Sequence, residues 1–366
     1  SSRPAPTQPV HDLRIATVRP LIAPAVLQEE LTLTTGGAAR EAEARRAVAD
    51  IIAGRDDRLV AVVGPCSIHE PSSAVEYAHE LRRLAERLAS DVLVVMRVYF
   101  EKPRTIVGWK GLINDPGLDG TFRINEGLRA ARRLLLDVNA LGLPAANEFL
   151  DTTIGQYYAD LISWGCIGAR TVESQVHREL ASGLSMPVGF KNRTDGDIKV
   201  AIDAMRAAHH PHWFPSLTLE GAPAVLGTTG NRDTHLVLRG GARTGPNYEA
   251  AAVAEAVALL QAAGQPGRVM IDCSHANSGK DHARQALVAE DVAGQISGGS
   301  TAVLGVMLES HLVAGRQDLV PGRALVHGQS ITDACLGWRE TVGVLERIAG
   351  ASAKRRRGRR RSARRR

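Results

Sequence analysis

The chain alternates eight short apolar runs with segments of helical periodicity, and this alternation constrains its fold more than any other feature. Short apolar runs are typical of strands that are buried on both faces of a parallel sheet. Strands that alternate with helices build such a sheet, and eight strands close it into a barrel. The sequence therefore predicts an α/β fold, a (β/α)₈ TIM barrel. The runs lie at 59–63, 92–96, 143–146, 166–169, 187–190, 235–238, 269–273 and 301–308.

A polar or metal-binding side chain follows each apolar run. In a (β/α)₈ barrel the active site lies at the carboxyl ends of the strands, so these side chains would meet there. Surface loops would supply some of them by chance, but a complete ring favours one shared site. The eight residues are Cys66, Arg97, Glu148, Arg170, Lys191, Arg239, His275 and Glu309.

The segment after the second run has the composition of a phosphate-binding loop. Cations at the end of a buried strand, such as Arg97 and Lys102, cost desolvation free energy unless an anion meets them. Pro103 fixes the backbone, Arg104 offers a fork of donors, and Thr105 offers a hydroxyl and an amide. For any single cation a solvated loop is the alternative interpretation.

This loop and three further cations at strand ends would bring six positive charges to the open end of the barrel. Two phosphates, or a phosphate and a carboxylate, would neutralise them. Nucleic acid is the rival anion, but barrel strand ends form a pit, and the site lacks interleaved aromatic residues that stack on bases. A pit favours small phosphorylated metabolites. The six cations are Arg97, Lys102, Arg104, Arg170, Lys191 and Arg239.

Four distant residues, Cys66, His275, Glu309 and Asp333, form a candidate metal site. A thiolate, an imidazole and two carboxylates suit one divalent transition metal ion, with Mn²⁺ foremost and Fe²⁺, Co²⁺ or Zn²⁺ as alternatives. Each residue also has a structural interpretation. Cys66 could be a buried apolar thiol, His275 a core histidine and Asp333 a helix cap.

The chain divides into three parts by composition. Residues 1–35 form an N-terminal extension that we expect to pack as an arm on a partner subunit. Residues 36–350 form the barrel, with a β-hairpin inserted at about 212–229. Residues 351–366 carry ten Lys or Arg and no acid, and without them 35 basic residues face 39 acidic ones. We expect this basic tail to be disordered, and non-specific binding to polyanions is the alternative role.

Several protein classes are disfavoured. The first ten residues do not resemble a signal peptide, and no apolar run approaches the ~18 residues that span a bilayer. Four cysteines without paired spacing favour a cytoplasmic protein with reduced thiols. Dinucleotide-binding and P-loop motifs are lacking.

Eight motifs, taken together, resemble those of one enzyme family. In chain order they are Gly64–His69, Met96–Thr105, Gly108–Pro116, Gly168–Thr171, Gly189–Asn192, Leu238–Gly241, Asp272–His275 and Glu309-Ser310. The sequence is similar to type I 3-deoxy-D-arabino-heptulosonate 7-phosphate (DAHP) synthases of the aromatic-amino-acid-regulated class. The likeness extends from about His11 to Gly350.

This resemblance implies the first step of the shikimate pathway, in which phosphoenolpyruvate and D-erythrose 4-phosphate condense with water. It implies a homo-oligomer, a tetramer or a dimer, and the four metal ligands given above. Lys102, Glu148 and His275 match catalytic positions. The residues that match the family's phosphoenolpyruvate site are Arg97, Ala169, Arg170, Lys191 and Arg239. Those that match its erythrose 4-phosphate site are Lys102, Pro103, Arg104, Thr105 and Asp333.

The resemblance also implies feedback inhibition by an aromatic amino acid. The matching regulatory positions are Asp151, Gly155, Leu184, Ser185, Phe214 and Ser216. Ser216 is more similar to phenylalanine-responsive members. Gly155 stands where proline is frequent, which puts feedback in doubt, and Asn147 and Arg193 stand where glycine is usual.

Two alternatives remain at this stage. The first is the related synthase of the eight-carbon lipopolysaccharide sugar acid, against which the segment 102–105 and the chain length argue. The second is a barrel that has lost catalysis and binds a partner protein, against which the complete set of matched ligands argues.

Overall fold

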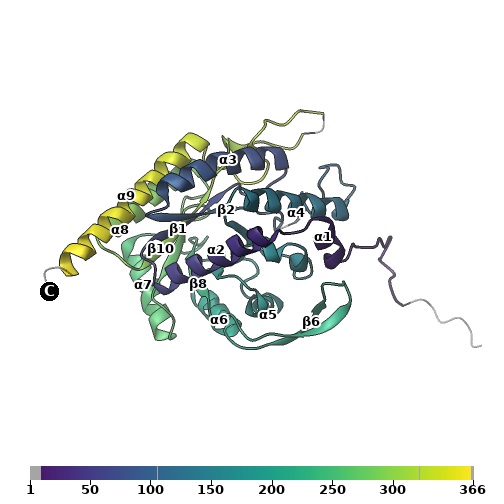
Figure 1. The fold of residues 1–366 in the computed structure, drawn as a ribbon, viewed down its shortest axis with the longest axis horizontal. Coiled ribbons are helices and arrows are strands. Elements are labelled where there is room, and N and C mark those ends of the chain that lie inside the picture. Colours follow the sequence, from purple (N-terminus) through teal and green to yellow (C-terminus); the bar gives the residue numbers. More distant parts are fainter. Residues whose placement is uncertain (1–9, 105, 321, 364–366) are drawn as a thin grey trace, which may run out of the picture.

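A computed structural model describes residues 10–104, 106–320 and 322–363, with side chains described as far as Arg359. Eight parallel strands form a closed barrel in the order β1-β10-β9-β8-β5-β4-β3-β2, which confirms the predicted fold class (Figure 1). The strands are β1 (Leu59–Gly64), β2 (Val92–Arg97), β3 (Ala145–Glu148), β4 (Trp164–Ile167), β5 (Val188–Lys191), β8 (Thr234–Leu238), β9 (Val269–Asp272) and β10 (Val303–Glu309).

Helices surround the barrel because each carries one apolar face toward the sheet. The α-helices are α1 (Pro24–Glu30), α2 (Thr35–Ala53), α3 (Pro71–Leu88), α4 (Ile124–Ala140), α5 (Gln175–Gly183), α6 (Lys199–Ala208), α7 (Ala250–Ala262), α8 (Gln285–Ser297) and α9 (Trp338–Ala363). Three short 3₁₀ helices are η1 (Ile154–Tyr157), η2 (Ala159–Leu161) and η3 (His282–Arg284). Among the described residues, no helix combines the length and apolar character needed to span a membrane.

The barrel has two apolar layers because strand side chains alternate between its faces. In β1, Val60 and Val62 point into the barrel interior, while their neighbours pack against the surrounding helices. Helix α2 closes the amino-terminal end of the barrel by inserting Val48 and Ile51 into the interior cluster. Catalytic chemistry is therefore confined to the opposite end, where the strand carboxyl ends open.

Two small sheets lie outside the barrel. The strands β6 (Trp213–Leu217) and β7 (Pro223–Gly227) pair in antiparallel fashion, which confirms the predicted hairpin. Its outward face is apolar, since Trp213 is 77% and Val225 is 68% exposed. The strands β11 (Val313–Arg316) and β12 (Gln329–Ser330) form the second sheet, beyond the end of β10.

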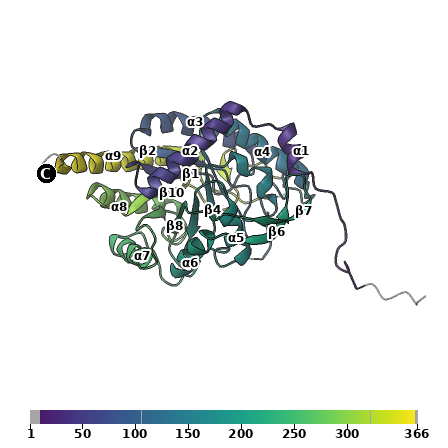
Figure 2. The same ribbon diagram turned by 60° about the horizontal axis from the view of Figure 1, so that its bottom comes forward.

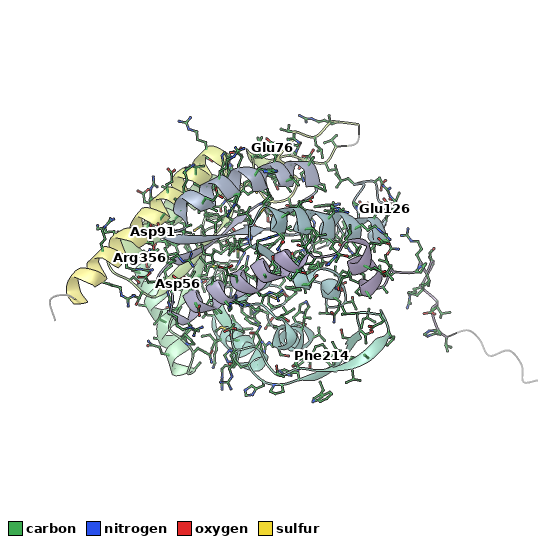
Figure 3. The ribbon with its side chains drawn as sticks, viewed as in Figure 1. Asp56, Glu76, Asp91, Glu126, Phe214 and Arg356 are labelled. Carbon is green, nitrogen blue, oxygen red and sulfur yellow. The ribbon has the colours of Figure 1, made fainter. Side chains whose placement is uncertain are left out.

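The prediction of a disordered tail from residue 351 is wrong for the described residues, because α9 continues to Ala363 (Figure 2). Ser352 Oγ donates to the Asp91 carbonyl at 3.0 Å, and Arg355 Nη2 donates to the Asp57 carbonyl at 2.8 Å. Arg356 forms ion pairs with Asp57 at 2.8 Å and with Asp91 at 3.0 Å. Figure 3 labels Arg356 and Asp91 at this end of the molecule. These partners lie more than 260 positions earlier, so local composition does not reveal them.

The N-terminal extension is fastened to the barrel by α1. Glu30 forms a bidentate ion pair with Arg129, in which Arg129 Nε lies 2.7 Å from Glu30 Oε2 and Arg129 Nη2 lies 2.9 Å from Glu30 Oε1. The buried Arg132 donates to the Leu31 carbonyl at 2.8 Å. The segment before α1 extends away from the barrel on the side of the hairpin (Figures 1 and 2).

Candidate active site

A cavity of about 610 Å³ opens at the carboxyl ends of the barrel strands. Most residues that the sequence predicts for the site line it, although they come from seven different barrel strands or the loops that follow them, and Asp333 from the segment after β12. Thr105 lies outside the described residues. The lining includes Arg97, Lys102, Pro103, Arg104, Glu148, Ala169, Arg170, Lys191, Arg239, His275, Glu309 and Asp333.

Three of the four predicted metal ligands form a compact group. One ligand atom each of Cys66, Glu309 and Asp333 lies within 4.8 Å of the other two. Lys102 Nζ lies 2.7 Å from Cys66 Sγ and 3.0 Å from Asp333 Oδ2, so these groups already stabilise a positive charge. Burial raises the pKa of Cys66 to about 12, and a cation that binds the sulfur would favour the thiolate. The donor set therefore fits a divalent transition metal ion.

His275, the fourth predicted ligand, lies beside this group and not within it. Its Nε2 atom lies 3.9 Å from Glu309 Oε1, but only 3.3 Å from Asp272 Oδ2 and from Lys191 Nζ. Its backbone has a φ of 56°, which is strained for a residue other than glycine. Such strain is common where a side chain is held for function.

Arg97 lies beneath the cavity, fully buried, on the last residue of β2. Its guanidinium contacts Glu309 Oε1 at 3.4 Å and the Pro65 carbonyl at 3.3 Å. The Cζ atom lies 3.9 Å from the centre of the Tyr99 ring, which is a cation–π arrangement. Tyr99 could not be singled out from the sequence, because cation–π geometry depends on the fold.

Lys191 is paired with a carboxylate that the sequence analysis did not select. Its Nζ lies 2.8 Å from Asp272 Oδ2, and both side chains are buried. Asp272 Oδ1 also accepts from Ser274 Oγ at 2.6 Å and from its backbone amide at 3.1 Å. Burial acts to raise the pKa of Asp272, but Lys191 and His275 outweigh it and hold the pKa below its ordinary value. Asp272 thus fixes the position of the Lys191 ammonium.

Glu148 depends on a glycine for its place. A Cβ atom on Gly168 would lie 2.0 Å from Glu148 Oε1, so only glycine leaves room for this carboxylate. The spacing explains why a glycine precedes Ala169 and Arg170 at the end of β4.

Arg239 and Arg104 are each oriented by backbone contacts. The Arg239 amide donates to Asn192 Oδ1 at 2.8 Å, and its guanidinium donates to the Gly240 carbonyl at 3.2 Å. Arg104 Nε donates to the Trp109 carbonyl at 2.8 Å. Each guanidinium keeps further donors that are free to bind an anion.

Lys280, His282 and Arg316 also line the cavity, although the sequence analysis did not predict them. They come from the loop and 3₁₀ helix after β9 and from β11, not from barrel strand ends. A rule based on strand ends cannot find such residues. Lys280 and Arg316 add to the positive charge around the cavity.

The predicted regulatory residues lie away from this cavity, on three neighbouring segments. Asp151 and Gly155 belong to the segment around η1, Leu184 and Ser185 follow α5, and Phe214 and Ser216 lie on β6. Gln156 Nε2 donates to the Leu217 carbonyl at 3.4 Å, which links η1 to the hairpin. Helix α5 also contacts β6.

The fold and the cavity together define a class of protein, a metal-dependent (β/α)₈ barrel enzyme that acts on small anionic substrates. A comparison with known families identifies which one. The chain belongs to the DAHP synthetase I family, which it matches over residues 32–346.

Curated relatives match nearly the whole chain. The Phe-sensitive phospho-2-dehydro-3-deoxyheptonate aldolase of Escherichia coli (strain K12) is 58% identical over 345 residues, which cover 94% of this chain and 98% of that protein. A Trp-sensitive aldolase of Enterobacter agglomerans is 52% identical over 340 residues, 93% and 97% of the two chains. The solved structure of a phospho-2-dehydro-3-deoxyheptonate aldolase from Francisella tularensis SCHU S4 is 50% identical, with a TM-score of 0.91, and the match covers 93% of this chain and 99% of that one.

Proposed function

We propose that this chain condenses phosphoenolpyruvate with D-erythrose 4-phosphate and water to give DAHP and phosphate, as the first step of the shikimate pathway. Family membership supports this activity. The observation that carries it is one cavity, which is lined by the six predicted cations and by three of the four predicted metal ligands. The fourth predicted ligand, Cys66, is hydrogen-bonded to Lys102 and Asp333 beside it.

The proposed phosphoenolpyruvate site is the inner part of the cavity. Arg97 and Lys191 lie buried at its floor, and Arg170 and Arg239 come from neighbouring strand ends. The backbone amide of Ala169 would add a donor. Three guanidinium groups and an ammonium suit a ligand with a phosphate and a carboxylate, because both anions take bidentate partners.

The proposed erythrose 4-phosphate site is the outer part of the cavity, formed by Lys102, Pro103, Arg104 and Asp333. The resemblance to the family motif adds Thr105, which lies outside the described residues. The guanidinium of Arg104 would hold the phosphate. Burial acts to lower the pKa of Lys102, but the adjacent Cys66, Glu309 and Asp333 outweigh it and raise the pKa. Lys102 therefore stays protonated and can donate a proton to the alkoxide that forms from the aldehyde.

We propose that Cys66, His275, Glu309 and Asp333 would hold one divalent metal ion, with Mn²⁺ foremost. When bound, such an ion supplies a Lewis acid that polarises the aldehyde carbonyl. Glu148 is placed to accept a proton from the water that adds to the other substrate. The cations hold two like-charged substrates in contact, which contributes to the rate through proximity.

We also propose a homo-oligomer, a tetramer or a dimer. The hairpin and the segment before α1 lie on the same side of the molecule (Figure 1). Both expose apolar side chains that suit a second copy, Trp213 and Val225 on the hairpin and Leu13 and Ile15 on the arm. An aromatic amino acid bound between η1, α5 and β6 is the proposed inhibitor. We place the protein in the cytoplasm because all four cysteines are buried and free.

One assay tests the proposed activity. The purified chain is mixed with phosphoenolpyruvate, Mn²⁺ and either erythrose 4-phosphate or arabinose 5-phosphate, with and without EDTA. We expect phosphate release with erythrose 4-phosphate, its loss with EDTA and its recovery with excess Mn²⁺. Greater activity with arabinose 5-phosphate, or none with either sugar, would contradict the proposal. Isothermal titration with Phe, Tyr and Trp tests regulation, and no heat from any of them would exclude it.

A further inference from the structure

The end of α9 places a dense cluster of cations at the amino-terminal end of the barrel, opposite the cavity. Asp57 and Asp91, which it contacts, directly precede β1 and β2. Figures 1 and 2 both show this end of the helix projecting beyond the barrel, on the side away from the hairpin. Residues 354–363, up to the end of α9, hold seven Lys or Arg and no acid. The end of this helix is therefore strongly basic, and its ion pairs with Asp57 and Asp91 attach it to the barrel.

This cluster is short of counter-charges among the described side chains. Asp57 and Asp91 pair with Arg356, whereas Arg355 and Arg268 donate to backbone carbonyls. Burial, and then the neighbouring arginines at 355 and 359, lower the pKa of Arg268 to about 10. Mutual repulsion of this kind costs free energy, and a bound anion would relieve it.

Among the side chains described, up to Arg359, three cations of this helix end face solvent. Lys354, Arg357 and Arg359 are exposed, while Arg355 and Arg356 face the barrel. The two inner arginines fix the helix in place, so the outer ones are held in a fixed array. Over residues 354–363 a helix extends by about 15 Å, a length along which a nucleic acid duplex carries about nine phosphate charges.

We propose that this helix binds the phosphodiester backbone of a nucleic acid duplex. Arginine forks match phosphate oxygens in pairs. Between residues 351 and 359 the helix presents no large apolar side chain. A helix that inserts into a membrane surface needs an apolar face, and a protein interface usually needs apolar anchors at its centre. Binding to a backbone needs neither, and it carries no base specificity.

Fluorescence anisotropy with a labelled duplex of 20 base pairs tests the proposal on the full chain, with DNA and RNA versions of one sequence. We expect affinity to fall steeply between 50 and 200 mM salt, because binding releases counterions. The variant Arg357→Gln/Arg359→Gln should bind at least about tenfold more weakly at 50 mM salt. It should also lower the slope of log K against log salt by about 1.8, at about 0.9 for each lost phosphate contact.

A matched control removes two exposed arginines outside this cluster, one near the end of α6 and one just before β8, in the variant Arg206→Gln/Arg232→Gln. Its net charge equals that of the test variant, and we expect its affinity to change less than about twofold. Both variants should keep the aldolase activity of the parent chain, since the helix end lies opposite the cavity. An equal loss in both variants, an unchanged salt slope, or tighter binding of polyglutamate than of either duplex would overturn the proposal.

Discussion

The buried ion pair of Lys191 and Asp272 provides the sharpest test of how the active site is built. The two charged atoms lie 2.8 Å apart, and the side chains are 5% and 0% exposed. Replacing Asp272 with Asn keeps the shape but leaves the ammonium buried without its counter-charge. Breaking a buried pair in this way costs about 3–5 kcal/mol, so we expect that loss in the free energy of unfolding.

A double-mutant cycle separates the pair from its surroundings. Lys191→Met should cost a similar amount, because it leaves the Asp272 carboxylate unpaired. The double variant buries neither charge, so its cost should fall short of the sum by at least about 2 kcal/mol. Urea denaturation of the four metal-free proteins, followed by circular dichroism, measures these free energies. In kinetic assays Asp272→Asn should raise the KM for phosphoenolpyruvate more than it lowers kcat.

An exposed pair serves as the control for this cycle. Glu30→Gln breaks the ion pair with Arg129, whose side chains are both 41% exposed, and should lower the free energy of unfolding much less than either substitution at the buried pair. Single costs at the buried pair that add to within about 0.5 kcal/mol would refute the reasoning. So would a buried pair that costs no more than the exposed one.

Three further predictions concern residues beside the site. Tyr99→Leu should raise the KM for phosphoenolpyruvate about three- to thirty-fold, whereas Tyr99→Phe keeps the ring under Arg97 and should not. Gly168→Ala should cut kcat by at least about tenfold with little change in urea stability, because the new Cβ displaces only the end of the flexible Glu148 side chain. Burial, and then Asp151, raise the pKa of Glu101 to about 8. Since the unfolded chain loses this proton near pH 4.5, stability should fall by up to about 4 kcal/mol from pH 5 to 8, and Glu101→Gln should lack that part of the decline.

The barrel and most of its site follow from the sequence because both are set by local patterns. Apolar runs mark the strands, and the residue after each run must lie at the carboxyl end of the barrel. Asp272 was not selected by this rule because it lies within the run at 269–273 and was taken as part of the strand. Its role depends on Lys191, which lies 81 positions earlier. Arg316 was not predicted as a site residue because it belongs to a strand outside the barrel.

The C-terminal segment also shows that a local sequence pattern does not predict which charges a side chain meets in the fold. A run of arginines indicates disorder when nothing neutralises it, and this was the prediction for residues 351–366. Arg356 instead meets Asp57 and Asp91, which lie far away in the sequence but next to each other across β1 and β2. The cations of the active site are likewise distinguished by their surroundings, since Lys191 is fixed by Asp272 while Arg239 keeps donors free to bind an anion. Whether a given arginine or lysine binds a ligand, anchors a helix or remains solvated thus depends on which carboxylates the fold brings to it, and no local pattern contains that information.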